Sequence, residues 1–177
     1  MKFVSDIRLL LLGLWLGAAV FFIGVAQTAF SVLPQRELAG AVVNRTLSIL
    51  NFSGLAIALL LLVLSAVVAK GSNKFLLWTD RVLIVIVAVS CAVGQFVIGL
   101  WLAAIRAQMG GKPIDEFAAD DPLRVQFNQL HEYSVWVLAA GMIAAFIAFF
   151  VIANRRVTTA AKLASSDPYN FEKEFKI

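Results

Sequence analysis

Long apolar stretches without a single charged residue alternate with short polar segments along this chain. The four stretches lie between Arg8 and Arg36, Arg45 and Lys70, Arg81 and Arg106, and Glu132 and Arg155. A helix of about 20 apolar residues, rising about 1.5 Å per residue, crosses the roughly 30 Å hydrocarbon core of a bilayer. The pattern therefore predicts four transmembrane helices.

Polar and helix-breaking residues between the stretches set the predicted helix boundaries. We expect helices at about residues 9–33, 45–69, 82–105 and 122–154. Pro34 ends the first helix, because proline cannot continue a helix interior without a kink. Asp121 and Pro122 have the pattern of an N-cap and a first-turn proline, so the fourth helix is expected to start above the membrane. Residues 155–177 are predicted to form a polar cytoplasmic tail.

The predicted fold class is all-α, an integral membrane four-helix bundle with short loops and a fourth helix that extends beyond the outer membrane face. Composition agrees, with 61% hydrophobic and 15% charged residues, against about 25% charged residues in soluble domains. The net charge of +4 comes from residues in loops and at helix ends, where they meet lipid headgroups. Membrane lipids are therefore expected partners, and nucleic acid is not.

Orientation follows from the distribution of Lys and Arg among alternate segments. The N-terminus, the second connection and the C-terminal tail carry ten of these residues, whereas the first and third connections carry five. Cytoplasmic segments of membrane proteins are richer in Lys and Arg. We expect a multi-pass protein of the cell (inner) membrane with both termini in the cytoplasm.

Small residues are expected at the helix contacts, because lipid is as apolar as leucine and helices associate in it through close packing. The candidate packing glycines are Gly13, Gly17, Gly24, Gly99 and Gly141. Gly13 and Gly17 form a G-x-x-x-G pattern, with Gly24 further along roughly the same face. A homodimer face on the first helix is the alternative, so a homo-oligomer or a membrane-complex partner stays open.

Any activity has to lie among the few polar residues of the spans. The candidate functional cluster consists of Gln27, Arg45, Asn51, Gln95, His131 and Glu132. The topology places the end of the first span and the starts of the second and fourth toward the outer leaflet. We therefore predict a polar cluster in the outer half of the bundle.

Each member also has a structural interpretation. Asn51 and Gln95 can form hydrogen bonds between helices, the commoner use of amides inside membranes. Arg45 can reach lipid headgroups or pair with Glu132. His131 is the only histidine, so it cannot build a zinc site or a bis-histidine haem site alone, and a structural role is favoured.

No enzyme is predicted. No serine, cysteine or carboxylate pair has a spacing that indicates a nucleophile with its base, so we assign no catalytic residue. We also assign no cofactor and no metal site. The single Cys91 lies within a span and is interpreted as a small packing residue.

Two segments resemble a known family. They are Leu14-Trp15-Leu16-Gly17 with Phe21-Phe22, Ala26, Phe30, Leu33-Pro34 and Ala39-Gly40, and Phe127-x-x-Leu130-His131-x-x-Ser134. They are similar to the transmembrane protein 205-like family, whose bacterial members carry the domain-of-unknown-function label 4149. The resemblance implies a four-helix fold in a membrane, and the family's association with tolerance of metal compounds implies export or trafficking.

Two positions depart from the family pattern. Gln27 stands where a proline is common, and Val137-Leu138 stands where an asparagine is expected. The leading interpretation is a non-enzymatic multi-pass membrane protein that handles a small solute or metal ion, or that serves as an accessory subunit of a membrane complex. The alternative is a redox or haem-binding helix bundle that uses His131 with a second ligand from a partner.

Overall fold

A computed structural model describes residues 2–67, 74–110 and 112–165 of the chain. These residues form α1 (Lys2–Val32), α2 (Arg36–Val67), α3 (Lys74–Ala92), the π-helical segment η1 (Val93–Ile98), α4 (Gly99–Gln108), the 3₁₀ turn η2 (Ile114–Glu116) and α5 (Pro122–Ser165). The described part of the chain is all-helical, as predicted.

Four helices are long and apolar enough to cross a membrane. They cover Phe3–Val32, Arg36–Ala66, Lys74–Gln108 and Pro122–Asn154 within the described residues. The third is a continuous rod made of α3, η1 and α4. The predicted four-helix membrane architecture is confirmed.

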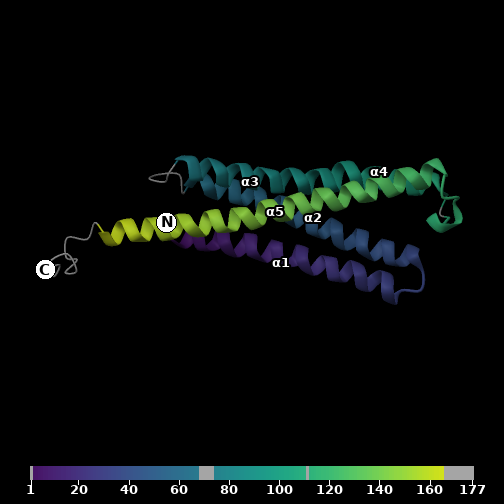
Figure 1. Ribbon diagram of the computed structural model, residues 1–177, viewed down its shortest axis with the longest axis horizontal. Coiled ribbons are helices and arrows are strands. Elements are labelled where there is room, and N and C mark those ends of the chain that lie inside the picture. The colour runs from purple at the N-terminus through teal and green to yellow at the C-terminus, as the bar shows by residue number, and fades with distance from the viewer. Residues whose placement is uncertain (1, 68–73, 111, 166–177) are drawn as a thin grey trace.

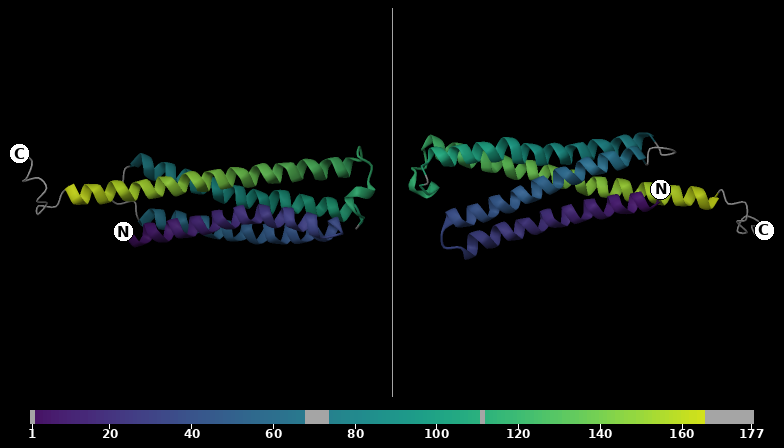
Figure 2. Two further views of the ribbon diagram at one scale, coloured as in Figure 1. Left: turned by 60° about the horizontal axis from the view of Figure 1, so that its bottom comes forward. Right: turned by 180° about the vertical axis from the view of Figure 1, so that it is seen from behind.

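The helices run up and down as antiparallel neighbours (Figure 1). One end of the bundle, here called the terminus end, holds the beginning of α1 and the point where α5 leaves the bundle. The opposite end, called the loop end, holds the α1–α2 and α4–α5 connections (Figures 1 and 2). Toward the loop end the α1–α2 pair diverges from α4 and α5 (Figure 1).

Two separate cores explain this divergence. The larger core joins α1, α2, α3 and α5 through residues such as Leu12, Trp15, Leu61, Ile84 and Ala145. The smaller core lies at the loop end and is built from η1, α4 with the residue after it, and α5, around Ile98, Ile105, Met109 and Leu130. Because α4 and α5 pack on each other there, α1 and α2 separate from them.

The helices extend further than the apolar stretches predicted. The expected connection over residues 35–44 is instead helical from Arg36, and α3 starts at Lys74, before the expected residue 82. Likewise, α5 continues to Ser165, although a tail was expected from residue 155; the rest of that tail, 166–177, lies outside the described residues. Missing charge marks only the part of a helix that faces hydrocarbon, whereas backbone hydrogen bonds continue into the polar interface.

Two of the predicted packing glycines do contact another helix. A Cβ added to Gly141 would lie 3.0 Å from the Cβ of Ser90, so α3 and α5 approach each other closely at this point. A Cβ on Gly13 would lie 3.5 Å from the ring of Phe149, which is an ordinary contact. A Cβ on Gly99 would meet only the carbonyl oxygen of Gly94, within the same rod.

The expectation that Gly17 and Gly24 pack inside the bundle needs correction. Both are exposed, and an added Cβ would find no atom within 4 Å. The tightest glycine is instead Gly54 on α2, where a Cβ would overlap Trp15 and Cys91. The Nε1 of Trp15 donates to the Leu50 carbonyl oxygen over 3.1 Å, which holds the indole against this turn of α2.

Candidate functional site

A groove of about 770 Å³ lies at the loop end, where the two pairs of helices diverge. Side chains from α1, α2, α4, α5 and the connection before α5 line it. Ligand pockets in proteins range from about 300 to 1,000 Å³ and are mostly apolar with a few placed polar groups. The groove has both the size and the composition of such a pocket.

Apolar side chains form the long walls of the groove. They come from α1, α2, α4 and α5, and include Phe22, Ile23, Phe30, Leu102, Val135 and Met142. Ile23, Phe30 and Val135 are each about half exposed, at 46%, 49% and 55%. The bundle by itself therefore leaves much of this apolar lining uncovered.

Four cationic side chains face the same space, against two carboxylates. The cations are Arg36, Arg106, Lys112 and Arg124, and the acids are Glu37 and Asp115. One ion pair joins them, from Arg36 Nη1 to Asp115 Oδ1 over 3.1 Å, with side chains 71% and 48% exposed. Exposed pairs of this kind contribute little stability. With four cations against two carboxylates, the groove lining has a net positive charge.

Arg106 is the most constrained of these cations. Its guanidinium carbon lies 5.2 Å from the centre of the Phe127 ring, a cation–π contact. Its Nη2 lies so close to α2 that a Cβ on Gly40 would be 3.0 Å away. Arg106 is partly buried and forms no ion pair with a carboxylate of the described residues. Its charge is therefore held at a fixed place beside the groove.

Arg124 is oriented differently, because its Nη1 donates to the carbonyl oxygen of Phe117 over 2.6 Å. That bond ties the start of α5 to the connection before it.

The backbone N–H of Leu123 donates to Asp121 Oδ1 over 2.8 Å, so Asp121 is the N-cap that the sequence predicted.

The groove brings together only part of the predicted polar cluster. Gln27 and His131 line it from α1 and α5, and both are exposed. The hydroxyl of Ser134 donates to the carbonyl oxygen of His131 over 2.6 Å. Arg45 and Glu132 are exposed outside the groove lining, and no ion pair joins them.

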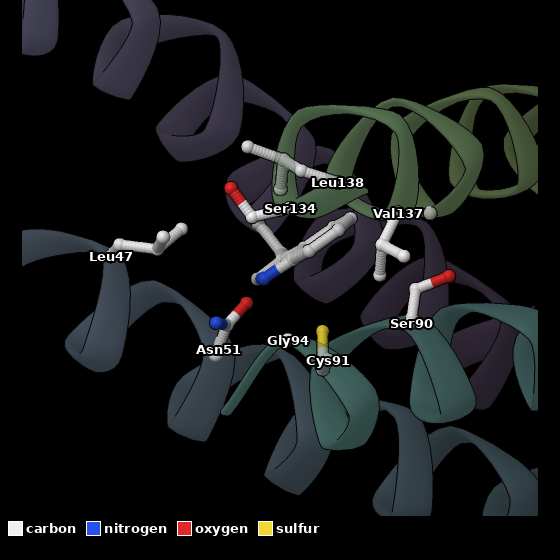
Figure 3. Close-up of a pocket in the computed structure, with 10 residues that line it drawn as sticks. Leu47, Asn51, Ser90, Cys91, Gly94, Ser134, Val137 and Leu138 are labelled. Atoms are coloured by element: carbon white, nitrogen blue, oxygen red, sulfur yellow. The ribbon is translucent and has the colours of Figure 1, made fainter. Parts of the chain in front are cut away.

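Asn51 lies deeper, beside a second, smaller cavity of about 10 Å³ (Figure 3). Leu47, Ser134 and Leu138 line both cavities, so the smaller one adjoins the inner end of the groove. The Asn51 side chain is only 5% exposed, and its amide forms no hydrogen bond with another described residue. Figure 3 shows this amide directed into the space between Leu47 and Gly94. The cavity has about the volume of one water molecule.

The π-helical segment η1 forms the wall opposite Asn51. An added Cβ on Gly94 would lie 3.1 Å from Asn51 Nδ2, a tight contact from which the amide would have to shift by a few tenths of an ångström. The N–H of Gly99 donates to the carbonyl oxygen of Gly94, five residues earlier. Gln95 also belongs to this segment and is partly buried. Single π-helical turns inside α-helices occur frequently at functional sites.

The terminus end holds a feature that the sequence reasoning missed. Arg8 of α1 and Asp80 of α3 form an ion pair over 2.7 Å, with side chains 1% and 0% exposed. Beside it, Arg81 Nε donates to the hydroxyl of Ser65 over 3.1 Å. Arg8, Asp80 and Arg81 each lie at the end of an apolar stretch. The acid Asp80 at the boundary of a span was the signal in the sequence that could have indicated an ion pair. Chain positions alone do not say which residues meet.

None of the described residues forms a group of three or more His, Cys, Asp or Glu side chains that could hold a metal ion.

The family model for a domain of unknown function (DUF4149) matches residues 10–111. This range reaches from α1 to the end of α4 and includes Asn51, η1 and Arg106. No curated protein and no solved structure matches the chain.

Proposed function

Because the chain belongs to the DUF4149 family, whose function is unknown, we propose a function from its own residues: binding of a small solute in the groove at the loop end. The sequence resemblance predicted this family, and the likeness to transmembrane protein 205 stays a prediction. The proposal makes the protein a non-enzymatic, multi-pass solute-binding protein of the membrane.

The groove itself is the observation that carries the proposal. Its volume of about 770 Å³ combines an uncovered apolar wall with a partly buried arginine that has no carboxylate partner among the described residues. A bundle built only for structural support would gain from closing this space, because apolar contacts and small-residue packing drive helix association in lipid. An occupant of about that volume would replace the missing contacts.

The opposite end of the bundle favours binding over conduction by a single chain. The large core and the Arg8–Asp80 pair fill the space between the helices at the terminus end. A separate cavity of about 10 Å³ beside Asn51 shares Leu47, Ser134 and Leu138 with the groove lining. Passage of a solute would require the helices to move, whereas binding requires no such change.

Orientation is part of the proposal. The excess of Lys and Arg near the terminus end favours a cytoplasmic location for that end in the cell membrane. The groove would then open toward the outer leaflet, where the predicted polar cluster was expected.

A second candidate is the accessory-subunit role in a membrane complex. The observation that favours it is the outward face of α1, where Gly17 and Gly24 are exposed and an added Cβ would meet no atom of the described residues within 4 Å. Small residues on such a face permit close approach by another helix.

The haem-binding alternative rests on His131 at the groove wall. Its second axial ligand would have to come from a partner, and a Soret band in the purified protein would test it.

The solute-binding proposal is tested by filling the groove. Ala26 lies in the groove lining on α1, and Ala18 is exposed on the same helix outside it. Native mass spectrometry of protein released from lipid nanodiscs would measure retained small molecules. We expect Ala26→Trp to lose an adduct that the wild type and Ala18→Trp both keep. Equal adducts in all three proteins would contradict the proposal.

A further inference from the structure

We infer that the occupant of the groove is an anionic membrane lipid, with its head group at Arg106 and an acyl chain along the apolar walls toward the middle of the bilayer. This inference rests on the proposed function of the groove and names the chemistry of its ligand. Three features of the groove carry it: the charge at its mouth, the fixed position of Arg106, and the length and polarity of its walls.

The charge at the groove favours an anion. Four cations and two carboxylates face the space, and Asp115 already pairs with Arg36. Arg124 is directed to a backbone carbonyl. Arg106 and Lys112 form no ion pair with a described carboxylate. Within the groove lining, Arg106 at the end of α4 and Lys112 in the connection to α5 are therefore cations without a carboxylate partner, and Glu37 is a carboxylate without a cation.

Arg106 has the position and chemistry of a head-group ligand. It occupies the last turn of α4, at the loop end of the membrane-spanning rod Lys74–Gln108. Cationic side chains at helix ends lie at the level of lipid head groups. Contact with Phe127 and close approach to Gly40 hold its guanidinium in place. A held guanidinium loses less freedom on binding and can donate two parallel hydrogen bonds to a phosphate.

The walls of the groove suit an acyl chain. On α5 the lining residues run from Arg124 to Met142, which corresponds to about 27 Å of helix at about 1.5 Å per residue. One leaflet contributes about 15 Å of hydrocarbon thickness, so the groove is long enough for a head group and the chain of one leaflet. Ile23, Ala26 and Phe30 on α1 continue the apolar surface on the facing side.

Neither half of such a ligand explains the groove alone. A free anion such as inorganic phosphate would bind the arginine and leave the apolar wall uncovered. A neutral lipid would cover the wall and leave the cations without a partner. An anionic lipid satisfies both, and the surrounding bilayer is its source.

The experiment compares two lipids with identical acyl chains, palmitoyl-oleoyl phosphatidylglycerol and palmitoyl-oleoyl phosphatidylcholine. The full chain is reconstituted in nanodiscs that contain both, and native mass spectrometry counts the lipids retained. We expect the wild type to retain phosphatidylglycerol preferentially and Arg106→Gln to lose about tenfold of that preference, because charged hydrogen bonds of this kind change binding by about that factor.

Matched controls separate the groove from general attraction to head groups. Arg45→Gln removes an exposed arginine of α2 outside the groove lining, and we expect it to keep the wild-type preference. Lys112→Gln removes an exposed cation at the mouth, and we expect a drop of about threefold, whereas an unchanged preference would contradict the inference. Because Lys112 is exposed, this second variant tests the inference even if Arg106→Gln fails to fold.

Each remaining outcome would overturn the inference in a different way. Equal losses in Arg106→Gln and Arg45→Gln would mean attraction of surface lipid only. Equal retention of both lipids by the wild type, abolished by Ala26→Trp, would keep the proposed groove function and reject the anionic ligand. Displacement of the lipid by inorganic phosphate would identify a free anion as the ligand. Lipid preference unaffected by Ala26→Trp would reject the groove itself.

Discussion

One guanidinium nitrogen of Arg8, Nη2, donates to both carboxylate oxygens of Asp80, over 3.0 and 2.7 Å, in a fully enclosed ion pair between α1 and α3. The two residues are 72 positions apart in the chain. They join the first and third membrane helices at the end opposite the groove. The pair thus holds the bundle closed where the groove leaves the other end open.

Breaking this pair on one side should destabilise the protein strongly. Arg8→Leu or Asp80→Leu removes one side of the buried ion pair, and breaking such a pair on one side costs about 3–5 kcal/mol. The double variant Arg8→Leu/Asp80→Leu removes both charges and should recover most of that loss. Thermal unfolding in detergent would measure this. A double variant as unstable as the sum of the two single variants would show that the charges do not act as a pair.

The Asn51 amide should contribute little to stability. Asn51 is 5% exposed and its amide forms no hydrogen bond to a described residue, so an apolar side chain of similar size removes no such bond. Asn51→Leu should therefore unfold at the same temperature as the wild type or a higher one. A clear drop in unfolding temperature would indicate that Asn51 forms a hydrogen bond between helices, which is the structural role considered for it from the sequence.

Two glycine substitutions should have opposite effects. At Gly54 a Cβ would overlap Trp15 and Cys91, so Gly54→Ala should destabilise the bundle by about 1–3 kcal/mol through overpacking. Gly17 has open space around it, and Gly17→Ala should be neutral or stabilise α1 by up to about 1 kcal/mol. Unfolding midpoints of both variants would decide. A large loss at Gly17 would indicate that this face contacts a second copy or another subunit.

Displacing Arg106 without removing its charge should weaken lipid binding. A Cβ on Gly40 would lie 3.0 Å from Arg106 Nη2, so the larger side chain of Gly40→Leu should move the guanidinium from its present position. We expect lower retention of phosphatidylglycerol by the folded protein, and Gly17→Leu serves as the control on an exposed face. Unchanged lipid preference in Gly40→Leu would show that the position of the guanidinium does not matter.

For much of the candidate site, the sequence could predict the end of the bundle where it lies but not which residues meet there. Gln27 and His131 were expected near one end of the bundle, and both line the groove. Arg106 was counted only as a loop cation, because its role depends on Gly40 and Phe127, which are distant from it in the chain. The pairing of Arg8 with Asp80 was hidden for the same reason. The π-helical turn at Val93–Ile98 also had no signal beyond its two nearby glycines, Gly94 and Gly99.

From the amino-acid pattern alone, the family, the four apolar helices and their up-and-down order could be predicted. The physical reason is that hydrocarbon leaves backbone polar groups no partner outside the helix, so a long uncharged stretch has one stable form. Tertiary structure alone decided which faces meet, that Gly54 rather than Gly17 is packed, and that the loop end opens into a groove. Lipid and core are equally apolar, so hydrophobicity along a membrane helix does not mark the face that packs.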